Sequence, residues 1–319
     1  SMFLKREGTD KNALPVVIGS HLDTQPTGGK YDGVLGVLAG LEIIRTLNDL
    51  NIQTKHPIMI VNWTNEEGSR FPPAMMASAG YAGIYDVKTL LSAEDAEGNI
   101  FGEELEKIGW KGTEPVGEQK IHCYYELHIE QGPILETEEI DIGVVIHGQG
   151  LKWLEVELSG TEQHTGTTPM HVRKDTSLAM SEIILAVNNI ANNNQPNALG
   201  SVGHIEVSPN SRNVIAGHSI FTIDFRSPDI NKLDKMENEL KLLAIDICNK
   251  YKVNFNMKQI GGFDPVTFDK DCLTNIRKSA EKFNYSYKDI VSGAGHDACW
   301  INSVAPSAMI MCPCVDGLS

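Results

Sequence analysis

Two adjacent carboxylates, Glu66 and Glu67, close an apolar, β-branched run that begins at Ile60. Such a run is typical of a buried strand that ends at the carboxyl edge of an α/β sheet, where these folds bind ligands. Successive residues of a strand point to opposite sides, so this pair can act together only if the backbone turns. A metal hydrolase uses one carboxylate to hold a cation and another to take a proton from water. An isolated acidic pair is more often solvated, so other strands must support this interpretation.

A second cluster follows the strand that the sequence predicts over 14–20. His21 and Asp23 project to the same side of an extended segment, which lets the carboxylate hold one imidazole nitrogen while the other binds a metal. Asp32 follows a polar, glycine-rich loop and opens an apolar helix predicted over 34–50. Alone, Asp32 would be an ordinary helix N-cap.

A third predicted strand, which starts near Ile121, carries His128 and ends before a Gly-Pro pair. The three strand ends together supply four possible metal ligands: His21, Asp32, Glu67 and His128. Two imidazoles and two carboxylates suit zinc, manganese, cobalt or nickel better than magnesium or calcium. Because a carboxylate between two histidine-bearing strands can bridge cations about 3.5–4 Å apart, two divalent metal ions are expected.

The composition excludes several other classes of protein. The net charge of -15 over 319 residues argues against a nucleic-acid partner, which needs a basic surface. No apolar run approaches the roughly 20 residues of a membrane span, and no signal peptide opens the sequence. The six cysteines form no Cys-x-x-Cys pair, so we expect reduced core thiols and a cytoplasmic protein without a membrane partner.

The middle of the chain differs from its two ends. After the change in composition near Gly148, the pattern predicts strands over 151–159, 200–208, 214–225 and 253–260, with helices over 175–190 and 230–251. The resulting βαββαβ order is that of a ferredoxin-like, two-layer unit. Helix and strand alternate again beyond Gly262, which predicts a first domain of residues 1–148 and 263–319 interrupted by a second domain of residues 149–262.

Five strings identify a family. They are His-Leu-Asp-Thr from 21, Asn-Trp-Thr-Asn-Glu-Glu-Gly-Ser-Arg-Phe from 62, Glu-Leu-His-Ile-Glu-Gln-Gly-Pro from 126, Gln-His-Thr-Gly-Thr-Thr-Pro-Met from 163 and Ser-Gly-Ala-Gly-His-Asp-Ala from 292. Together they resemble the carbamoylase branch of the M20 metallopeptidase-like amidohydrolases. That branch includes N-carbamoyl-L-amino acid hydrolase, β-ureidopropionase and allantoate amidohydrolase.

The resemblance implies an α/β fold with two parts. These are a zinc-peptidase-like catalytic domain built on a mixed sheet and an inserted ferredoxin-like βαββαβ domain that serves as lid and dimerisation domain. Four side chains would hold two metals, with His21 and His128 on the first, Asp32 bridging to the second, and Glu67 on the second.

The resemblance also implies catalytic and binding roles. Asp23 would orient His21, and Glu66 would be the general base. Five further residues would bind the substrate or line its pocket: Gln131, His164, Asn213, Arg226 and His296. The implied enzyme is a dinuclear metal amidohydrolase of linear amides and amidines, a homodimer that hydrolyses the ureido C–N bond of a small N-carbamoyl amino acid. Its products are an amino acid, carbon dioxide and ammonia.

One departure from the family pattern concerns the end of the sequence. Relatives continue with Gly-x-Ser-His, whose histidine ligates the second metal beside Glu67, whereas this sequence stops at Ser319, one residue short. Relatives also carry a helical segment before the first strand. We therefore expect a chain truncated at both ends, with an incomplete second metal site and poor activity.

Three alternatives remain open from the sequence. Within the branch, the runner-up is allantoate amidohydrolase, although Asn62 to Asn65 and Pro133 favour the carbamoylases. An M20 aminopeptidase or dipeptidase is the second, although Gln131, Asn213 and Arg226 favour a ureido substrate. An inactive, truncated binding protein is the third. The native metal, and the choice between α- and β-carbamoyl substrates, stay open.

Overall fold

The computed structural model describes residues 1–318 and divides into two compact units. The first unit contains residues 1–148 and the chain from 267 onward, and the second contains residues 149–266. The last long strand of the second unit ends at Phe263, and the first unit resumes at Thr267. Ser319, on which the expectation about the end of the chain depends, lies outside the described residues.

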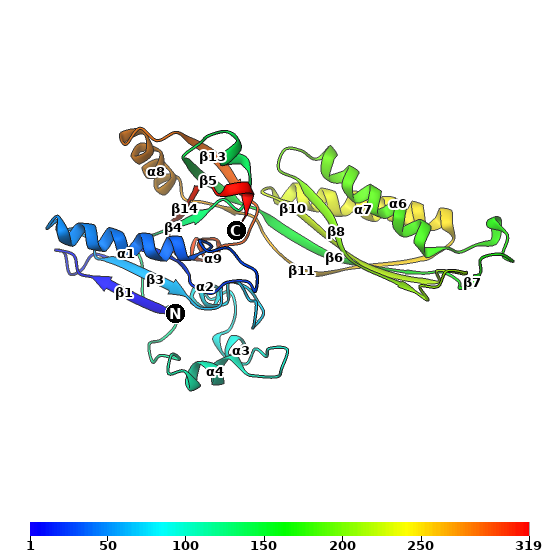
Figure 1. The fold of residues 1–319 in the computed structure, drawn as a ribbon, viewed down its shortest axis with the longest axis horizontal. Coiled ribbons are helices and arrows are strands. Elements are labelled where there is room, and N and C mark those ends of the chain that lie inside the picture. Colours follow the sequence, from blue (N-terminus) through cyan, green and yellow to red (C-terminus); the bar gives the residue numbers. More distant parts are fainter. Residues whose placement is uncertain (319) are drawn as a thin grey trace. The chain divides into compact units, whose positions relative to one another are not determined.

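Within residues 1–318, the first unit is built on an eight-stranded mixed sheet (Figure 1). Its strands are β1 (Met2–Arg6), β2 (Val16–His21), β3 (Ile58–Trp63), β4 (Cys123–Ile129), β5 (Ile142–Gly148), β12 (Val266–Thr267), β13 (Tyr287–Ser292) and β14 (Ser307–Cys312). They lie in the order β1-β3-β2-β4-β14-β5-β12, and β13 also pairs with β5. The central pairs β3-β2, β2-β4 and β4-β14 are parallel, whereas β1-β3 and β14-β5 are antiparallel. The predicted α/β fold with a mixed sheet is confirmed.

Seven helices of the first unit pack around this sheet or in the loops that leave it, among the described residues. They are α1 (Val34–Asp49), α2 (Met76–Ala82), α3 (Val87–Leu91), α4 (Phe101–Lys107), α5 (Ile134–Thr137), α8 (Lys270–Lys282) and α9 (Asp297–Ile301). Helix α1 lies close against the sheet because glycines face it. A Cβ atom at Gly36 would come within 2.4 Å of the Leu127 carbonyl oxygen. This close packing fixes the start of α1 beside the ends of β2 and β4.

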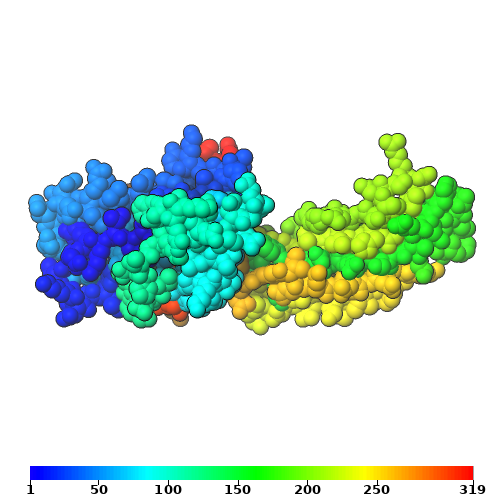
Figure 2. Space-filling model, turned by 90° about the horizontal axis from the view of Figure 1, so that it is seen from below, coloured from blue at the N-terminus to red at the C-terminus, as the bar shows by residue number. Residues whose placement is uncertain are grey.

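The second unit is a four-stranded antiparallel sheet covered on one face by two helices (Figure 1). Its elements are β6 (Gly150–Ser159), β7 (Gln163–His164), α6 (Thr176–Asn193), β8 (Leu199–Ser208), β9 (Val214–Ile215), β10 (His218–Ser227), α7 (Ile230–Tyr251) and β11 (Asn254–Phe263). The sheet order is β11-β6-β10-β8. Strand β11 lies open along one edge (Figure 2, orange). Along β10, Phe221, Ile223 and Phe225 are buried and alternate with half-buried residues that occupy the opposite face.

The single strand predicted over 214–225 is wrong. The chain breaks at Ala216–Gly217 into β9, which pairs with β7, and β10, which joins the main sheet. Only glycine fits at this break, since a Cβ atom at Gly217 would lie 2.6 Å from Cγ of Glu162. Helix α7 begins and ends at the predicted residues, Ile230 and Tyr251. No helix among the described residues is long and apolar enough to cross a membrane.

Helix α6 offers a matched test of the core of the second unit. Ile183 is fully buried, whereas Leu185 on the same helix is 63% exposed. Ile183→Ala should lower the free energy of unfolding by about 2–5 kcal/mol, because it leaves a cavity in a packed core. Leu185→Ala should change it by no more than about 0.5 kcal/mol. Urea denaturation measures both, and equal losses would contradict this assignment of the core.

Candidate metal centre

The carboxyl ends of three parallel strands bring the predicted metal ligands to one edge of the sheet. Strand β2 pairs with β3 until His21 lies opposite Trp63, and it also pairs with β4, the strand that carries His128. Each strand is followed by a loop with acidic residues. Parallel pairing therefore gathers side chains that are far apart in the sequence, as expected for an α/β sheet.

Both histidines present the same nitrogen to a shared carboxylate. Nδ1 of His21 donates to the carbonyl oxygen of Asp23 at 2.9 Å, and Nδ1 of His128 donates to that of Ile129 at 2.9 Å. Because a carbonyl oxygen only accepts, the proton lies on Nδ1 and the lone pair on Nε2. The Nε2 atoms of His21 and His128 lie 3.6 and 3.2 Å from Oδ1 of Asp32. This is the tautomer that metal ligation requires.

Gly33 makes room for this arrangement. It has φ +68°, and a Cβ atom there would lie 2.4 Å from Cε1 of His21. Its backbone N–H donates to Nε2 of His128 at 3.3 Å. Asp32 precedes it and is only 4% exposed. Gly33 is therefore required both by its left-handed backbone and by the close approach of the imidazole.

The backbone turns at Glu66 and Glu67, which is the condition for these two carboxylates to act together. Asn65 and Gly68 have φ +60° and +64°, so left-handed backbone brackets Glu66 and Glu67. Ligand atoms of Glu66, Glu67 and His21 all lie within 4.8 Å of one another. The turn thus brings both carboxylates to the side of the sheet edge that carries His21.

The Asp23 side chain binds the backbone of Glu66 and Glu67, a contact that was not predicted from the sequence. Its carboxylate accepts from the backbone N–H groups of Glu66 at 3.2 Å and Glu67 at 3.1 Å. The expected carboxylate contact with His21 is longer, 3.9 Å to Nδ1, and the Asp23 carbonyl takes that imidazole proton instead. Asp23 therefore orients His21 through its backbone and orients the Glu66–Glu67 turn through its side chain.

The residues fit a divalent metal ion. Ligand atoms of His21, Asp32 and His128 form one group within 4.8 Å, and all three side chains are buried. Oε1 of Glu67 is buried without a hydrogen-bond partner among residues 1–318. A buried carboxylate oxygen without a donor is unfavourable, and a cation would satisfy it. Mixed nitrogen and oxygen donors suit a transition metal.

Burial and neighbouring charges shift the acid–base behaviour of the site. Burial raises the pKa of Glu66 well above its ordinary value, and the negative charges of Asp297 and Glu126 raise it further. Burial lowers the pKa of His128, but the neighbouring carboxylates of Asp32 and Glu126 outweigh it, so the net shift is upward. Glu66 is therefore a stronger base than a solvated glutamate.

A second layer of buried carboxylates lies behind these residues, and the sequence reasoning missed its main member, Glu126. Its Oε1 accepts from Oγ of Ser20 at 3.0 Å, and its Oε2 accepts from the backbone N–H of Ala298 at 2.8 Å. Asp297 accepts from the hydroxyl of Ser78. The alternation of residues 126 and 128 along one strand was the available signal, because it puts both side chains on the same face.

Two of the predicted substrate-pocket residues lie at this centre. Nε2 of Gln131 donates to Oδ2 of Asp32 at 2.7 Å. The ring of His296 lies 4.5 Å from that of His128 between centroids, and its Nε2 contacts Oγ of Ser292 at 3.1 Å. Burial, followed by the neighbouring His128, lowers the pKa of His296 well below its ordinary value. A neutral His296 is the consequence.

The other three predicted binding residues belong to the second unit, where they form two separate groups. His164 on β7 lies beside Asn213, because the backbone N–H of Thr165 donates to the Asn213 carbonyl at 2.9 Å. Arg226 is the penultimate residue of β10, at the opposite end of that strand from His218. Its guanidinium donates to Asp224 with bonds of 2.7 to 3.1 Å.

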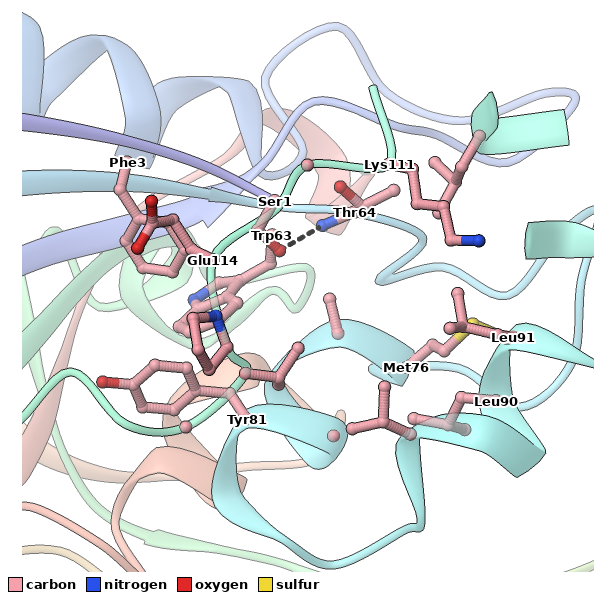
Figure 3. A pocket seen from close by; sticks show the side chains of 18 of the residues that line it. Ser1, Phe3, Trp63, Thr64, Met76, Tyr81, Leu90, Leu91, Lys111 and Glu114 are labelled. Carbon is pink, nitrogen blue, oxygen red and sulfur yellow. Dashed lines mark hydrogen bonds between the residues drawn. The ribbon is translucent and has the colours of Figure 1, made fainter. Parts of the chain in front are cut away.

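A separate cavity of about 810 Å³ opens elsewhere in the first unit (Figure 3). Phe3, Trp63, Tyr81 and Leu90 are among the side chains that line it. None of the predicted metal, catalytic or substrate residues does so. Its largely apolar wall does not suit a charged ureido acid, so we place the chemistry at the metal centre.

Comparisons with known proteins show the family of the chain. Residues 17–319 match the profile of peptidase family M20/M25/M40. The chain is 57% identical over 319 residues to an N-carbamoyl-L-amino-acid amidohydrolase from Rhizobium meliloti, covering 100% of this chain and 77% of that protein. It is 32% identical over 322 residues to the allantoate amidohydrolase of Escherichia coli, covering 100% of this chain and 78% of that one.

A solved structure extends the similarity to the fold. An amidase of the hydantoinase/carbamoylase family from Burkholderia multivorans superposes with a TM-score of 0.96 at 49% identity. The match covers 99% of this chain and 77% of that one. The predicted family is confirmed, and the chain belongs to peptidase family M20/M25/M40.

Proposed function

We propose that this protein hydrolyses the ureido C–N bond of N-carbamoyl amino acids. The observation that carries the proposal is the pair of buried imidazoles whose Nε2 atoms face Asp32, with the carboxylate of Glu66 3.5 Å from Nε2 of His21. This arrangement suits metal-assisted hydrolysis. The name of the relative that is 57% identical, an N-carbamoyl-L-amino-acid amidohydrolase, supports the choice of substrate class.

Two divalent ions, zinc or else manganese, cobalt or nickel, are proposed as cofactors. His21, His128 and Asp32 would hold the first, and Asp32 and Glu67 the second, which is consistent with their buried ligand atoms. When bound, these ions would polarise the ureido oxygen and lower the pKa of a water molecule.

Glu66 is the proposed general base. It takes a proton from the water that adds to the ureido carbon and returns it to the terminal nitrogen, which leaves as ammonia. The carbamic acid that remains on the amino acid then loses carbon dioxide. Burial raises the pKa of Glu66 and favours its binding of the proton. The hydrogen bonds from the Glu66 and Glu67 backbone to Asp23 keep the base in place.

Arg226 is the proposed ligand for the substrate carboxylate. Its planar guanidinium can donate two parallel hydrogen bonds to a carboxylate, which the point charge of lysine cannot do. Asp224 fixes the side chain through its own carboxylate. His164 and Asn213 are the proposed donors to the oxyanion that forms during hydrolysis. Gln131 and His296 would line the pocket.

The second unit is proposed to act as lid and dimerisation domain. His164 and Asn213 lie beyond the end of β10 that starts at His218, whereas Arg226 lies at its other end. The eight residue steps between His218 and Arg226 span roughly 26 Å of extended strand. That is far longer than a carbamoyl amino acid, so one substrate cannot contact both groups of a single chain. We infer that His164 and Asn213 serve the site of the other subunit in a homodimer.

A substrate panel tests the proposed reaction. The metal-reconstituted protein should release ammonia from N-carbamoyl-L-methionine or N-carbamoyl-β-alanine, and more slowly or not at all from allantoate. Glu66→Gln should lower kcat by about 10²–10⁴-fold, because the amide cannot take a proton. An ammonia assay measures both effects.

Glu103→Gln is the matched control, because Glu103 is an exposed glutamate on α4 and should leave turnover unchanged. Ammonia from allantoate alone would instead support allantoate hydrolysis. Hydrolysis of peptides alone would move the protein to the aminopeptidases. Metal-loaded protein that is inert on every substrate would contradict the proposed reaction.

Arg226→Lys tests recognition of the carboxylate. The variant should raise KM for an N-carbamoyl amino acid about tenfold or more, because it loses a charge-assisted pair of hydrogen bonds. The KM for the same N-carbamoyl amino acid with its carboxylate converted to an amide should change little, since that substrate has no carboxylate. Steady-state kinetics on the two substrates measures the difference. An equal rise for both would show that Arg226 does not contact the carboxylate.

Mixing two inactive variants tests the shared site. Glu66→Gln lacks the base of its own site, and His164→Ala would lack the donor that it supplies to its partner. After both are unfolded and refolded together at equal amounts, random pairing should restore about a quarter of the wild-type rate, because each mixed dimer has one intact site. No recovery in a mixture that contains mixed dimers by mass spectrometry would refute sharing.

A further inference from the structure

Two glutamine amides each donate to one of the carboxylates proposed as metal ligands. Nε2 of Gln131 donates to Oδ2 of Asp32 at 2.7 Å. Nε2 of Gln25 donates to Oε2 of Glu67 at 2.9 Å and also contacts the Glu67 carbonyl oxygen at 3.3 Å. The two glutamines come from different loops, one after β2 and one after β4. The same chemical contact thus occurs once on each carboxylate.

In both pairs the amide binds one carboxylate oxygen and leaves the other oxygen available to a cation. Oδ1 of Asp32 faces the imidazoles at 3.6 and 3.2 Å, and Gln131 contacts Oδ2. Gln25 contacts Oε2 of Glu67, while Oε1 is buried without a partner among residues 1–318. Each glutamine therefore fixes the rotation of its carboxylate about the bond that carries it.

The backbone at Gln131 indicates that this orientation is specifically maintained. Gln131 has φ +55°, a left-handed conformation that residues other than glycine seldom adopt and that concentrates at functional sites. The neighbouring Glu130 anchors the turn, because its carboxylate accepts from the backbone N–H groups of Ile134 at 3.0 Å and Leu135 at 2.8 Å. The strained residue is held between Glu130 and its bond to Asp32.

An amide suits this task better than a cationic side chain. A lysine or arginine would also donate to the carboxylate, but its positive charge would repel an incoming metal ion. A neutral amide orients the oxygen atoms and leaves the negative charge available to the cation. Outer-layer donors of this kind are known to tune metal affinity.

We propose that Gln131 and Gln25 are positioning residues that orient Asp32 and Glu67 for metal binding. This inference rests on the proposed metal site and assigns Gln131 a role other than lining the substrate pocket. It also gives a role to Gln25, an exposed residue outside the motifs that carry the predicted ligands.

The experiment measures metal affinity without substrate. The metal-free full chain and the variants Gln131→Met and Gln25→Met are titrated with Zn²⁺ in competition with a chromophoric chelator. Methionine keeps the length of the side chain and removes the donor. Each variant should bind Zn²⁺ about 10–100-fold more weakly than the wild type. Gln195→Met is the control, because the Gln195 amide donates to backbone carbonyls of the second unit, at 3.0 and 2.6 Å.

Several results would overturn the inference. One is wild-type Zn²⁺ affinity in both variants, and another is a raised KM in Gln131→Met with unchanged Zn²⁺ affinity, which would assign Gln131 to the substrate. Circular dichroism of the metal-free proteins checks folding. Because Gln25 is exposed, Gln25→Met keeps the test valid even if Gln131→Met misfolds.

The proposed reaction can fail separately. Wild-type protein that binds Zn²⁺ but hydrolyses no carbamoyl substrate would remove the proposed reaction and leave the role of the glutamines standing. Wild-type protein that binds no Zn²⁺ would overturn the glutamine inference.

Discussion

The cluster of buried carboxylates around Glu66 is the main physical constraint on the first unit. Burial raises the pKa of Glu66, and the negative charges of Asp297, Glu126, Glu67 and Asp23 raise it further. Buried carboxylates destabilise a fold unless protons, donors or cations compensate them. Part of the compensation is visible in hydroxyl and backbone donors, and the proposed metal ions would supply the rest. Formation of the site and binding of its cations are therefore coupled.

The parallel sheet makes this collection of charge possible. Side chains that leave the carboxyl ends of β2, β3 and β4 meet without any long reach, because the strands are in register. This explains why the proximity of these side chains could be predicted from the sequence. A His, Asp or Glu at the end of a strand can be recognised from residue type and spacing. Parallel strands then bring these side chains to the same edge of the sheet. Gly33 adds a steric requirement that only the structure reveals, since it depends on the position of the His21 ring.

What the sequence could not predict depends on loop conformation. The carboxylate of Asp23 binds the backbone of Glu66 and Glu67, although its spacing from His21 pointed to the imidazole. Gln25 reaches Glu67 across 42 positions in the sequence, and no periodicity encodes such a contact. The interruption at Gly217 was missed for a similar reason, because apolar residues continue on both sides of the break. Regular elements follow from periodicity, whereas these contacts follow from individual turns.

The two units meet different physical demands with different sheets. Metal ligation requires fixed positions, and two of the proposed ligands, His21 and His128, lie on buried strands that cannot move without unpacking the sheet. The proposed ligand of the substrate carboxylate, Arg226, is instead placed on β10 by the simple alternation of a strand. Phe221, Ile223 and Phe225 fill the core on one face, so Asp224 and Arg226 share the other. Because residues two apart on a strand are neighbours on one face, Asp224 can hold Arg226 without help from a distant segment. Residues on that face can therefore change without disturbing the cluster of buried charges in the first unit.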